Sequence, residues 1–229
     1  SQRDQTGRKA GKPPSSSSSR VAQKKGHSKP IGDILNRNIY LIGYLLLTIL
    51  LSVVFFDFLS GTFYYMFTDI GSDTVNYNYP FHLYVSKYLR TDGFPTWSHA
   101  VGMGQNIMSS SLMRPFTYLL YIVGPENIPY TMVWMEILKI ILAYVIFYQF
   151  LKLWKLTPVT RVLGALLFCY SGFMIVGGSW YQFSLETVLL AFLLLAFEKL
   201  YQDNSWYLFP VSIALICMTQ PFNLYLFGL

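Results

Sequence analysis

Five long apolar segments set the fold class of this chain. They are residues 39–56, 128–151, 162–176, 183–197 and 206–229, and the first runs for 18 residues without a charge. A helix needs about 20 mostly apolar residues to cross a bilayer, and fewer when flanking side chains reach the interface. Only 12% of the residues are charged, against about 25% in a soluble domain. The sequence therefore predicts an all-α polytopic membrane protein.

Basic residues are concentrated before the first apolar segment. Nine of the 17 Lys and Arg residues lie within residues 1–38, with only two acids. Residues 1–37 are rich in Ser, Gly, Pro and Lys, so we expect a disordered tail. We place this tail in the cytoplasm, in contact with membrane lipids and not with nucleic acid, and residues 57–127 outside the cell. Because the chain begins with Ser and ends inside an apolar segment, we expect it to be part of a longer protein.

The predicted outer loop, residues 57–127, is too long for a simple connector. Apolar and aromatic residues recur at helical spacing from Tyr79 to Leu89. Pro80 suits the first turn of a helix, and Asp92-Gly93 suits its end. We expect an amphipathic helix on the outer surface here, and a second interfacial or re-entrant segment over Met113–Val123.

Asp73 is the candidate catalytic residue. It lies about 17 residues beyond the first apolar segment, in a stretch rich in Tyr and Asn. A carboxylate at the membrane–water boundary is suited to take a proton from an acceptor hydroxyl as a general base. The alternatives are a solvated loop acid or a helix N-cap. Asp69 lies four residues earlier, and the pair lacks the D-x-D spacing that would argue for a metal.

Charged residues near or within the apolar segments are further candidates. Glu186 lies near the outer end of the fourth segment, where it lines the same site as Asp73, reaches the interface, or pairs with Arg114. Glu136 and Lys139 share a helix face, so they pair with each other, or Lys139 binds the phosphate of a donor. Arg114 binds either that phosphate or a lipid headgroup.

Metal and nucleotide signatures are weak or missing in the sequence. His82 and His99 lack further ligands at metal spacing, and Cys169 and Cys217 fit small core positions in apolar helices. We therefore predict no cofactor or metal, although a divalent metal stays open. No P-loop or dinucleotide fingerprint occurs, which favours a lipid-linked sugar donor over a nucleotide sugar.

A series of short motifs resembles one family. The stretch Gly71-Ser72-Asp73 followed by Tyr79-Pro80-Phe81 is similar to the outer loop of YfhO-type bacterial membrane proteins. Further matches follow in the same order over residues 38–201: Gly102-x-Gly104-x-Asn106, Pro115-Phe116, Leu138-Lys139, Tyr170-Ser171-Gly172, Ser179-Trp180, Leu185-Glu186 and Phe197-Glu198-Lys199-Leu200. The resemblance implies a GT-C-like helical bundle whose first outer loop carries an essential acid. Glu186 departs from it, because an Asp is expected there.

The resemblance implies a membrane glycosyltransferase. Its donor would be a polyprenyl-phosphate-linked sugar, and its acceptor a wall polymer such as lipoteichoic acid on the outer face of a bacterial cell membrane. Asp73 is expected to be the catalytic residue, assisted by Asp69 or Glu186. Arg114 and Lys139 are expected to bind the donor phosphate. The expected contacts with the sugar or acceptor are Tyr77, Asn106 and Trp180. The alternatives are a lipid or polysaccharide transporter (flippase) and a non-catalytic scaffold of wall assembly.

Overall fold

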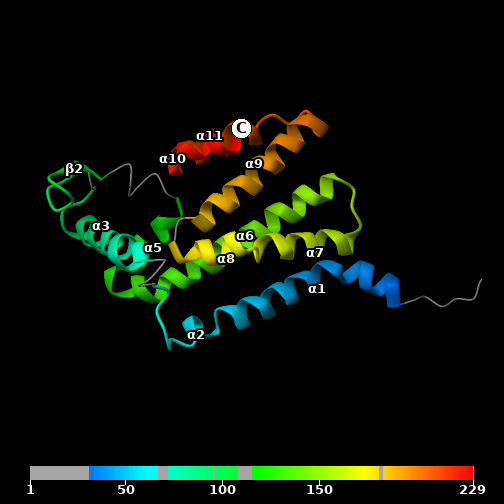
Figure 1. Cartoon of the computed structure of the whole chain (residues 1–229), viewed down its shortest axis with the longest axis horizontal. Helices are drawn as coiled ribbons and strands as arrows, with labels where there is room; N and C mark the ends of the chain where they lie inside the picture. Colours follow the sequence, from blue (N-terminus) through cyan, green and yellow to red (C-terminus); the bar gives the residue numbers. More distant parts are fainter. Residues whose placement is uncertain (1–30, 67–71, 95, 108–114, 181–182, 229) are drawn as a thin grey trace, which may run out of the picture.

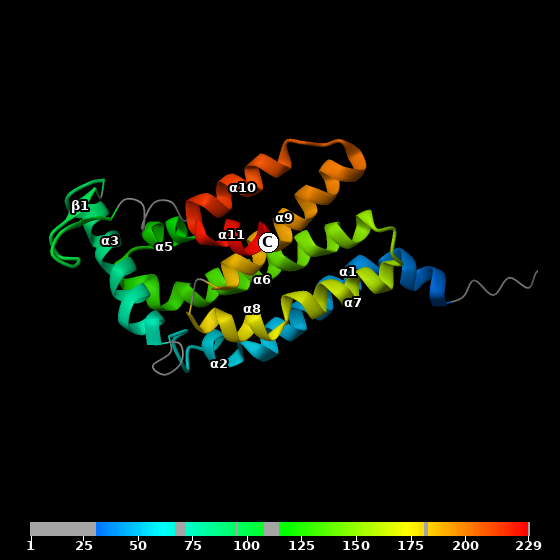
Figure 2. The same cartoon turned by 45° about the horizontal axis from the view of Figure 1, so that its top comes forward.

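The computed structural model describes residues 31–66, 72–94, 96–107, 115–180 and 183–228, which form a helical bundle with a group of shorter helices at one end (Figures 1 and 2). The longer helices are α1 (Ile31–Val54), α3 (Tyr79–Thr91), α6 (Ile128–Leu153), α7 (Pro158–Cys169), α9 (Phe183–Asp203) and α10 (Leu208–Thr219). The shorter elements are α2 (Phe56–Leu59), η1 (Thr74–Asn78), β1 (Trp97–Ser98), β2 (Gln105–Asn106), η2 (Pro115–Thr117), α5 (Tyr118–Val123), η3 (Pro125–Asn127), α8 (Gly172–Gly177), η4 (Gly178–Trp180) and α11 (Phe222–Gly228).

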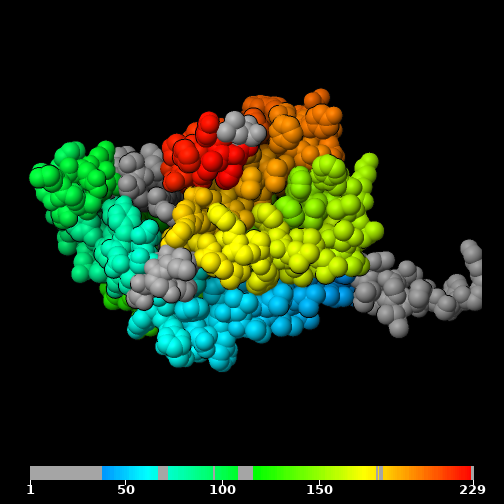
Figure 3. Space-filling view, viewed as in Figure 1, coloured from blue at the N-terminus to red at the C-terminus, as the bar shows by residue number. Residues whose placement is uncertain are grey.

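Helix α6 is the centre of the bundle. It packs against α7 and α9, while α1 packs against α7 and α10 against α9. Buried residues of α6 cover a broad face of the helix, whereas Trp134 on its remaining side is exposed. Helix α1 instead lies along one edge (Figure 3), and Leu41, Leu45 and Val53 on it are exposed. A continuous apolar face of this kind suits contact with lipid.

Two helical stretches in the described part of the chain are long and apolar enough to cross a membrane. They are Pro125–Leu153 and Pro158–Gly177, and they contain the predicted segments 128–151 and 162–176. Shorter apolar helices occur at Asn38–Val54 and Leu208–Thr219. The crossing of the membrane by the other three predicted segments stays a prediction.

Two of the predicted segments each contain two helices in the structure. The segment 162–176 changes from α7 to α8 at Ser171, because the side chain of Ser171 accepts a hydrogen bond from the Met174 amide and starts a new helix. The segment 206–229 divides into α10 and α11 at Gln220, next to Pro221, which has no N–H to continue the helical hydrogen bonds.

The ends of two other predicted segments are displaced. Helix α1 begins at Ile31, inside the stretch that the sequence assigned to the disordered tail; residues 1–30 lie outside the described residues. Helix α9 continues to Asp203, beyond the predicted end at residue 197. Both extensions carry polar residues that an apolar run does not include, and a helix does not need to stop where its apolar stretch stops.

Helix α3 confirms the amphipathic helix predicted within residues 57–127. It starts at Tyr79, has Pro80 in its first turn and ends at Thr91. Phe81 and Val85 are buried, whereas Lys87 is exposed. Helix α3 packs against α5 and α6, so its apolar face is partly occupied by protein. The second predicted segment appears as η2 and α5, except for residues 113–114, which lie outside the described residues.

A small β-hairpin departs from the all-α prediction. Strands β1 and β2 pair antiparallel, with Trp97 opposite Asn106. Gly102 and Gly104 between them have φ values of 60° and 103°, in the left-handed region that favours glycine. The Tyr84 hydroxyl of α3 is 2.7 Å from Ser98 Oγ, which fastens the hairpin to the helix. Strands of two residues are too short to show as an alternating pattern in the sequence.

Gly43 allows α1 to approach α6 and α7. A methyl group at this position would clash with the Tyr144 hydroxyl and lie 3.1 Å from a Val162 methyl. We expect Gly43→Ala to lower the free energy of unfolding by about 1–2 kcal/mol, because overpacking costs ~1–3 kcal/mol and the helical preference for Ala offsets up to ~1 kcal/mol. Thermal unfolding in detergent measures this effect.

The matched control is Gly172→Ala, where a methyl group would have no atom within 4 Å. Its melting temperature should equal or slightly exceed that of the wild type. An equal loss of stability in both variants would contradict the close approach at Gly43.

Candidate functional site

A buried polar cluster joins α6 to α9. Lys139 Nζ lies 3.0 Å from Glu136 Oε2 and 3.1 Å from Ser184 Oγ. The Ser184 hydroxyl donates to the same Glu136 oxygen at 2.8 Å. Glu136 and Ser184 are fully buried, and Lys139 is 2% exposed. Each of the three side chains therefore contacts the other two inside the bundle.

The spacing of Glu136 and Lys139 in the sequence indicated an ion pair as one alternative. The structure confirms this ion pair. Burial of a charged group costs free energy unless the group is paired and hydrogen-bonded. Glu136 and Lys139 provide this pairing for each other. A phosphate contact by Lys139, the other alternative, would require this enclosed cluster to open. That role stays a proposal.

The short turn η4 packs directly on Glu136. A methyl group at Gly178 would lie 2.8 Å from Glu136 Oε1 and 2.6 Å from the Tyr65 hydroxyl. Gly178 itself has φ −58°, which any residue adopts, so the position requires glycine for space. Glu136 Oε1 is buried without a hydrogen-bond partner among the described residues. Turn η4 is therefore seated against a polar, fully enclosed carboxylate.

Asn78 connects turn η4 to Asp73. Its side-chain amide donates to the Asp73 carbonyl at 3.2 Å and to the Trp180 carbonyl at 3.4 Å. Asn78 is 3% exposed, so this link is protected from water. The structure thus brings Asp73 and Trp180, 107 positions apart in the sequence, to the same end of the bundle.

Asp73 lies at the start of η1, a π-helical turn. Such turns are rare and are frequently found at functional sites. The Asp73 side chain is exposed and makes no capping hydrogen bond, so its carboxylate does not serve as the N-cap that the sequence offered as an alternative. The Asp73 carboxylate is therefore accessible to solvent, on a backbone that Asn78 holds.

The predicted sugar or acceptor contacts fall at two places. Tyr77 is 50% exposed and its ring is stacked on Phe81, with centroids 5.8 Å apart. The Trp180 ring is partly buried and meets Phe183 edge-on at 4.7 Å. Both belong to the Asp73 end of the bundle. Asn106 belongs instead to the hairpin, which Figures 1 and 2 show beyond the far end of α3.

Of the three other predicted site residues, the structure describes Glu186 alone. Glu186 is partly buried in the first turn of α9. It follows Ser184 by two residues, and residues two apart on a helix do not share a face, so the two lie on different faces of α9. Asp69 and Arg114 lie outside the described residues, and so the proposed contact of Arg114 with Glu186 or a phosphate stays a prediction.

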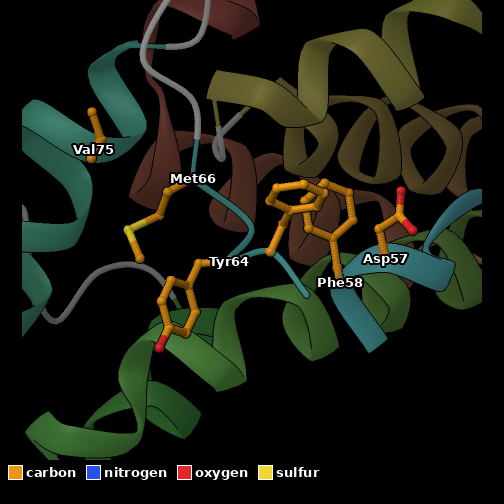
Figure 4. A pocket seen from close by; sticks show the side chains of 6 residues that line it. Asp57, Phe58, Tyr64, Met66 and Val75 are labelled. Carbon is orange, nitrogen blue, oxygen red and sulfur yellow. The ribbon is translucent and has the colours of Figure 1, made fainter. Parts of the chain in front are cut away.

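A pocket of about 400 Å³ opens beside η1 (Figure 4). Its lining is mainly aromatic and apolar, with one carboxylate: Asp57, Phe58, Phe63, Tyr64, Met66 and Val75. Val75 belongs to η1, whose N-cap is Asp73, so the pocket lies beside the turn that carries the candidate base. The Tyr64 hydroxyl lies 3.1 Å from that of Tyr130 on α6, and this hydrogen bond raises the pKa of Tyr64.

Metal ligands are sparse in the part of the chain that the structure describes, which holds no group of three or more His, Cys, Asp or Glu suited to a metal ion. His82 is buried, with its Nδ1 3.2 Å from the Tyr121 hydroxyl. It therefore acts as a core residue. Independence of a metal stays a prediction.

Comparison with known proteins gives one match. The family model described as "Bacterial membrane protein YfhO" matches residues 42–224. The chain belongs to the YfhO family of bacterial membrane proteins. This confirms the resemblance drawn from the short motifs and supports a membrane location. No curated protein and no solved structure matches the chain.

The YfhO match runs from α1 to α11 and includes the buried cluster and Asp73. Two members of this arrangement, Ser184 and Asn78, were missed by the sequence analysis. Ser184 lies 45 residues from Lys139 and Asn78 lies 102 residues from Trp180. The only signal was the Glu136–Lys139 spacing, which indicates a pair but not its further partners.

Breaking the buried pair should be costly. We expect Lys139→Met to lower the free energy of unfolding by about 3–5 kcal/mol, because it leaves the Glu136 carboxylate enclosed without its counter-charge. The double variant Glu136→Gln/Lys139→Met removes both charges and should recover most of that loss. Denaturant or thermal unfolding in detergent measures both variants. A double variant at least as unstable as Lys139→Met would contradict the account.

Proposed function

We propose that this YfhO-family protein is a membrane glycosyltransferase. It transfers a sugar from a polyprenyl-phosphate donor to a hydroxyl of a wall polymer, such as one like lipoteichoic acid, on the outer face of the bacterial cell membrane. The N-terminus lies in the cytoplasm in this proposal, the partners are lipids and glycans, and no nucleic acid takes part. The observation that carries the proposal is the exposed Asp73 carboxylate on a π-helical turn fastened to Trp180.

Asp73 acts as the general base. A base must come within hydrogen-bond reach of the proton that it removes, and the exposed carboxylate is accessible to an incoming acceptor. The hydrogen bonds of Asn78 hold the backbone on which this carboxylate stands. Holding a catalytic group in a productive geometry contributes to rate by itself.

The reaction is a displacement at the anomeric carbon of the sugar. The acceptor oxygen forms a bond to that carbon while the bond from carbon to the phosphate oxygen breaks. The hydroxyl proton passes to Asp73, and the electron pair of the broken bond leaves with the lipid phosphate. A phosphate is already a good leaving group, so the proposal includes no metal.

Other residues are proposed to assist. Asp69 or Glu186 orients the acceptor or stabilises positive charge that develops on the sugar. Arg114 holds the donor phosphate, because a guanidinium matches phosphate geometry. Lys139 adds to this charge if the cluster with Glu136 opens during the reaction.

The surroundings of Asp73 are suited to an amphiphilic donor. The 400 Å³ pocket next to η1 is lined mostly by aromatic and apolar side chains, which suit part of a lipid chain. Tyr77 and Trp180 offer aromatic surface to a sugar, and Asn106 is proposed to reach the acceptor from the hairpin. Aromatic rings bury a large apolar area and accept sugar rings as stacking partners.

Replacement of Asp73 tests this function. Full-length Asp73→Asn is returned to cells that lack the gene, at matched membrane abundance, and the sugar content of the wall polymers is measured by mass spectrometry. We expect the specific modification to disappear, since loss of a general base lowers the rate by ~10²–10⁴-fold.

Asp92→Asn is the matched control, because Asp92 is an exposed carboxylate of the same segment, at the end of α3. It should restore the modification fully. Full restoration by Asp73→Asn as well would remove Asp73 from the chemistry and favour a transporter or a scaffold of wall assembly.

A further inference from the structure

We propose that Glu136 is a positioning residue for Asp73, acting through turn η4. This inference rests on the proposed function, since it gives Glu136 a part in the reaction at Asp73. Glu136 is fully buried, so it does not touch the substrate in this state. Its effect must be transmitted through the side chains and backbone packed against it.

The first link runs from the carboxylate to the turn. Glu136 Oε1 and the Tyr65 hydroxyl both lie against Gly178, which leaves no space for a methyl group. Tyr65 is 3% exposed and packs on Phe55 and Phe58. Glu136 Oε1 and the Tyr65 hydroxyl therefore form a packing surface, here called the floor, on which η4 lies. This floor has little freedom to move.

The floor is rigid because Glu136 is held from its other side. Its Oε2 accepts from Lys139 and from Ser184, at 3.0 Å and 2.8 Å. The three side chains come from α6 and from the start of α9, directly after the turn. A buried side chain held by two hydrogen bonds has few alternative positions, so Glu136 fixes where η4 lies relative to α6.

The second link runs from the turn to Asp73. The Trp180 carbonyl ends η4 and accepts from Asn78, which also donates to the Asp73 carbonyl. The path from Glu136 to Asp73 therefore consists of one packed glycine and two hydrogen bonds of a buried amide. Movement of η4 would displace the Trp180 carbonyl, which accepts a hydrogen bond from Asn78. The Asn78 amide would follow, and so would the Asp73 backbone to which it donates.

The test uses Gly178→Ala in the full-length protein, with Gly164→Ala as its matched control. A methyl group at Gly164 would lie 2.7 Å from the tip of Leu151, which is partly exposed and is able to turn away. Both variants introduce the same methyl group with a similar clash. Only Gly178→Ala disturbs the floor beneath η4.

Hydrogen–deuterium exchange provides a readout that does not need activity. We expect faster exchange over residues 72–80 in Gly178→Ala and wild-type exchange there in Gly164→Ala. Asn78→Ala, which cuts the second link without touching Glu136, should give the same change over residues 72–80 and leave α6 unchanged. This second variant still tests the link from η4 to Asp73 if Gly178→Ala does not fold.

Kinetics distinguish positioning from a loss of stability alone. Gly178→Ala and Asn78→Ala should each lower kcat by about tenfold or more, towards the ~10²-fold that a 1 Å misplacement can cost, with KM for the donor unchanged. Since both act on one path, the double variant should be no slower than the slower single one, whereas independent effects would multiply.

Wild-type exchange over residues 72–80 in both single variants would overturn the inference, and so would multiplicative losses of kcat. If the wild-type protein transfers no sugar from polyprenyl donors, the proposed function fails on its own. The exchange pattern then still decides whether turn η4, packed on Glu136, and the Asp73 segment are coupled.

Discussion

The enclosed ion pair between Glu136 and Lys139 is the interaction on which the rest of the structure depends. Two charges inside an apolar bundle are costly unless they pair with each other and gain further hydrogen bonds. Here Ser184 supplies the third partner, and so α6 and α9 meet in one relative position. Apolar side chains alone would define the relative position of α6 and α9 less strictly, because apolar helix surfaces pack in several arrangements of similar free energy.

The buried ion pair also determines the position of turn η4 at the end of the bundle. Turn η4 lies between the start of α9 and the end of α8, and Gly178 lets it sit on Glu136. Asn78 then ties η1 to that turn, so the exposed Asp73 stands on a backbone fixed from inside the bundle. A carboxylate that is open to solvent but rigidly supported is what a general base at a membrane surface requires.

Local patterns in the sequence predicted the local features of this fold. The spacing of Phe81 and Val85 predicted α3, and the spacing of Glu136 and Lys139 indicated an ion pair. Contacts between residues distant in the sequence could not be predicted. The local sequence around Ser184 or Asn78 does not differ from that around a polar residue that makes no long-range contact. The break at Ser171 was missed for a related reason: apolar content continues across it, and only the capping hydrogen bond ends one helix and starts the next. Asp73 was proposed because it is an acid in a stretch rich in Tyr and Asn beyond an apolar segment, and its catalytic role stays a proposal.

The most direct test of the account is transfer of a labelled sugar by the purified full-length protein in proteoliposomes. The donor is a polyprenyl-phosphate-linked radiolabelled sugar, and the acceptor is a wall-polymer fraction. The account predicts label on the polymer in proportion to wild-type protein, and a rate at least ~10²-fold lower when the Asp73 carboxylate is replaced by an amide. Equal transfer by both proteins, or none by the wild type with any such donor, would contradict it.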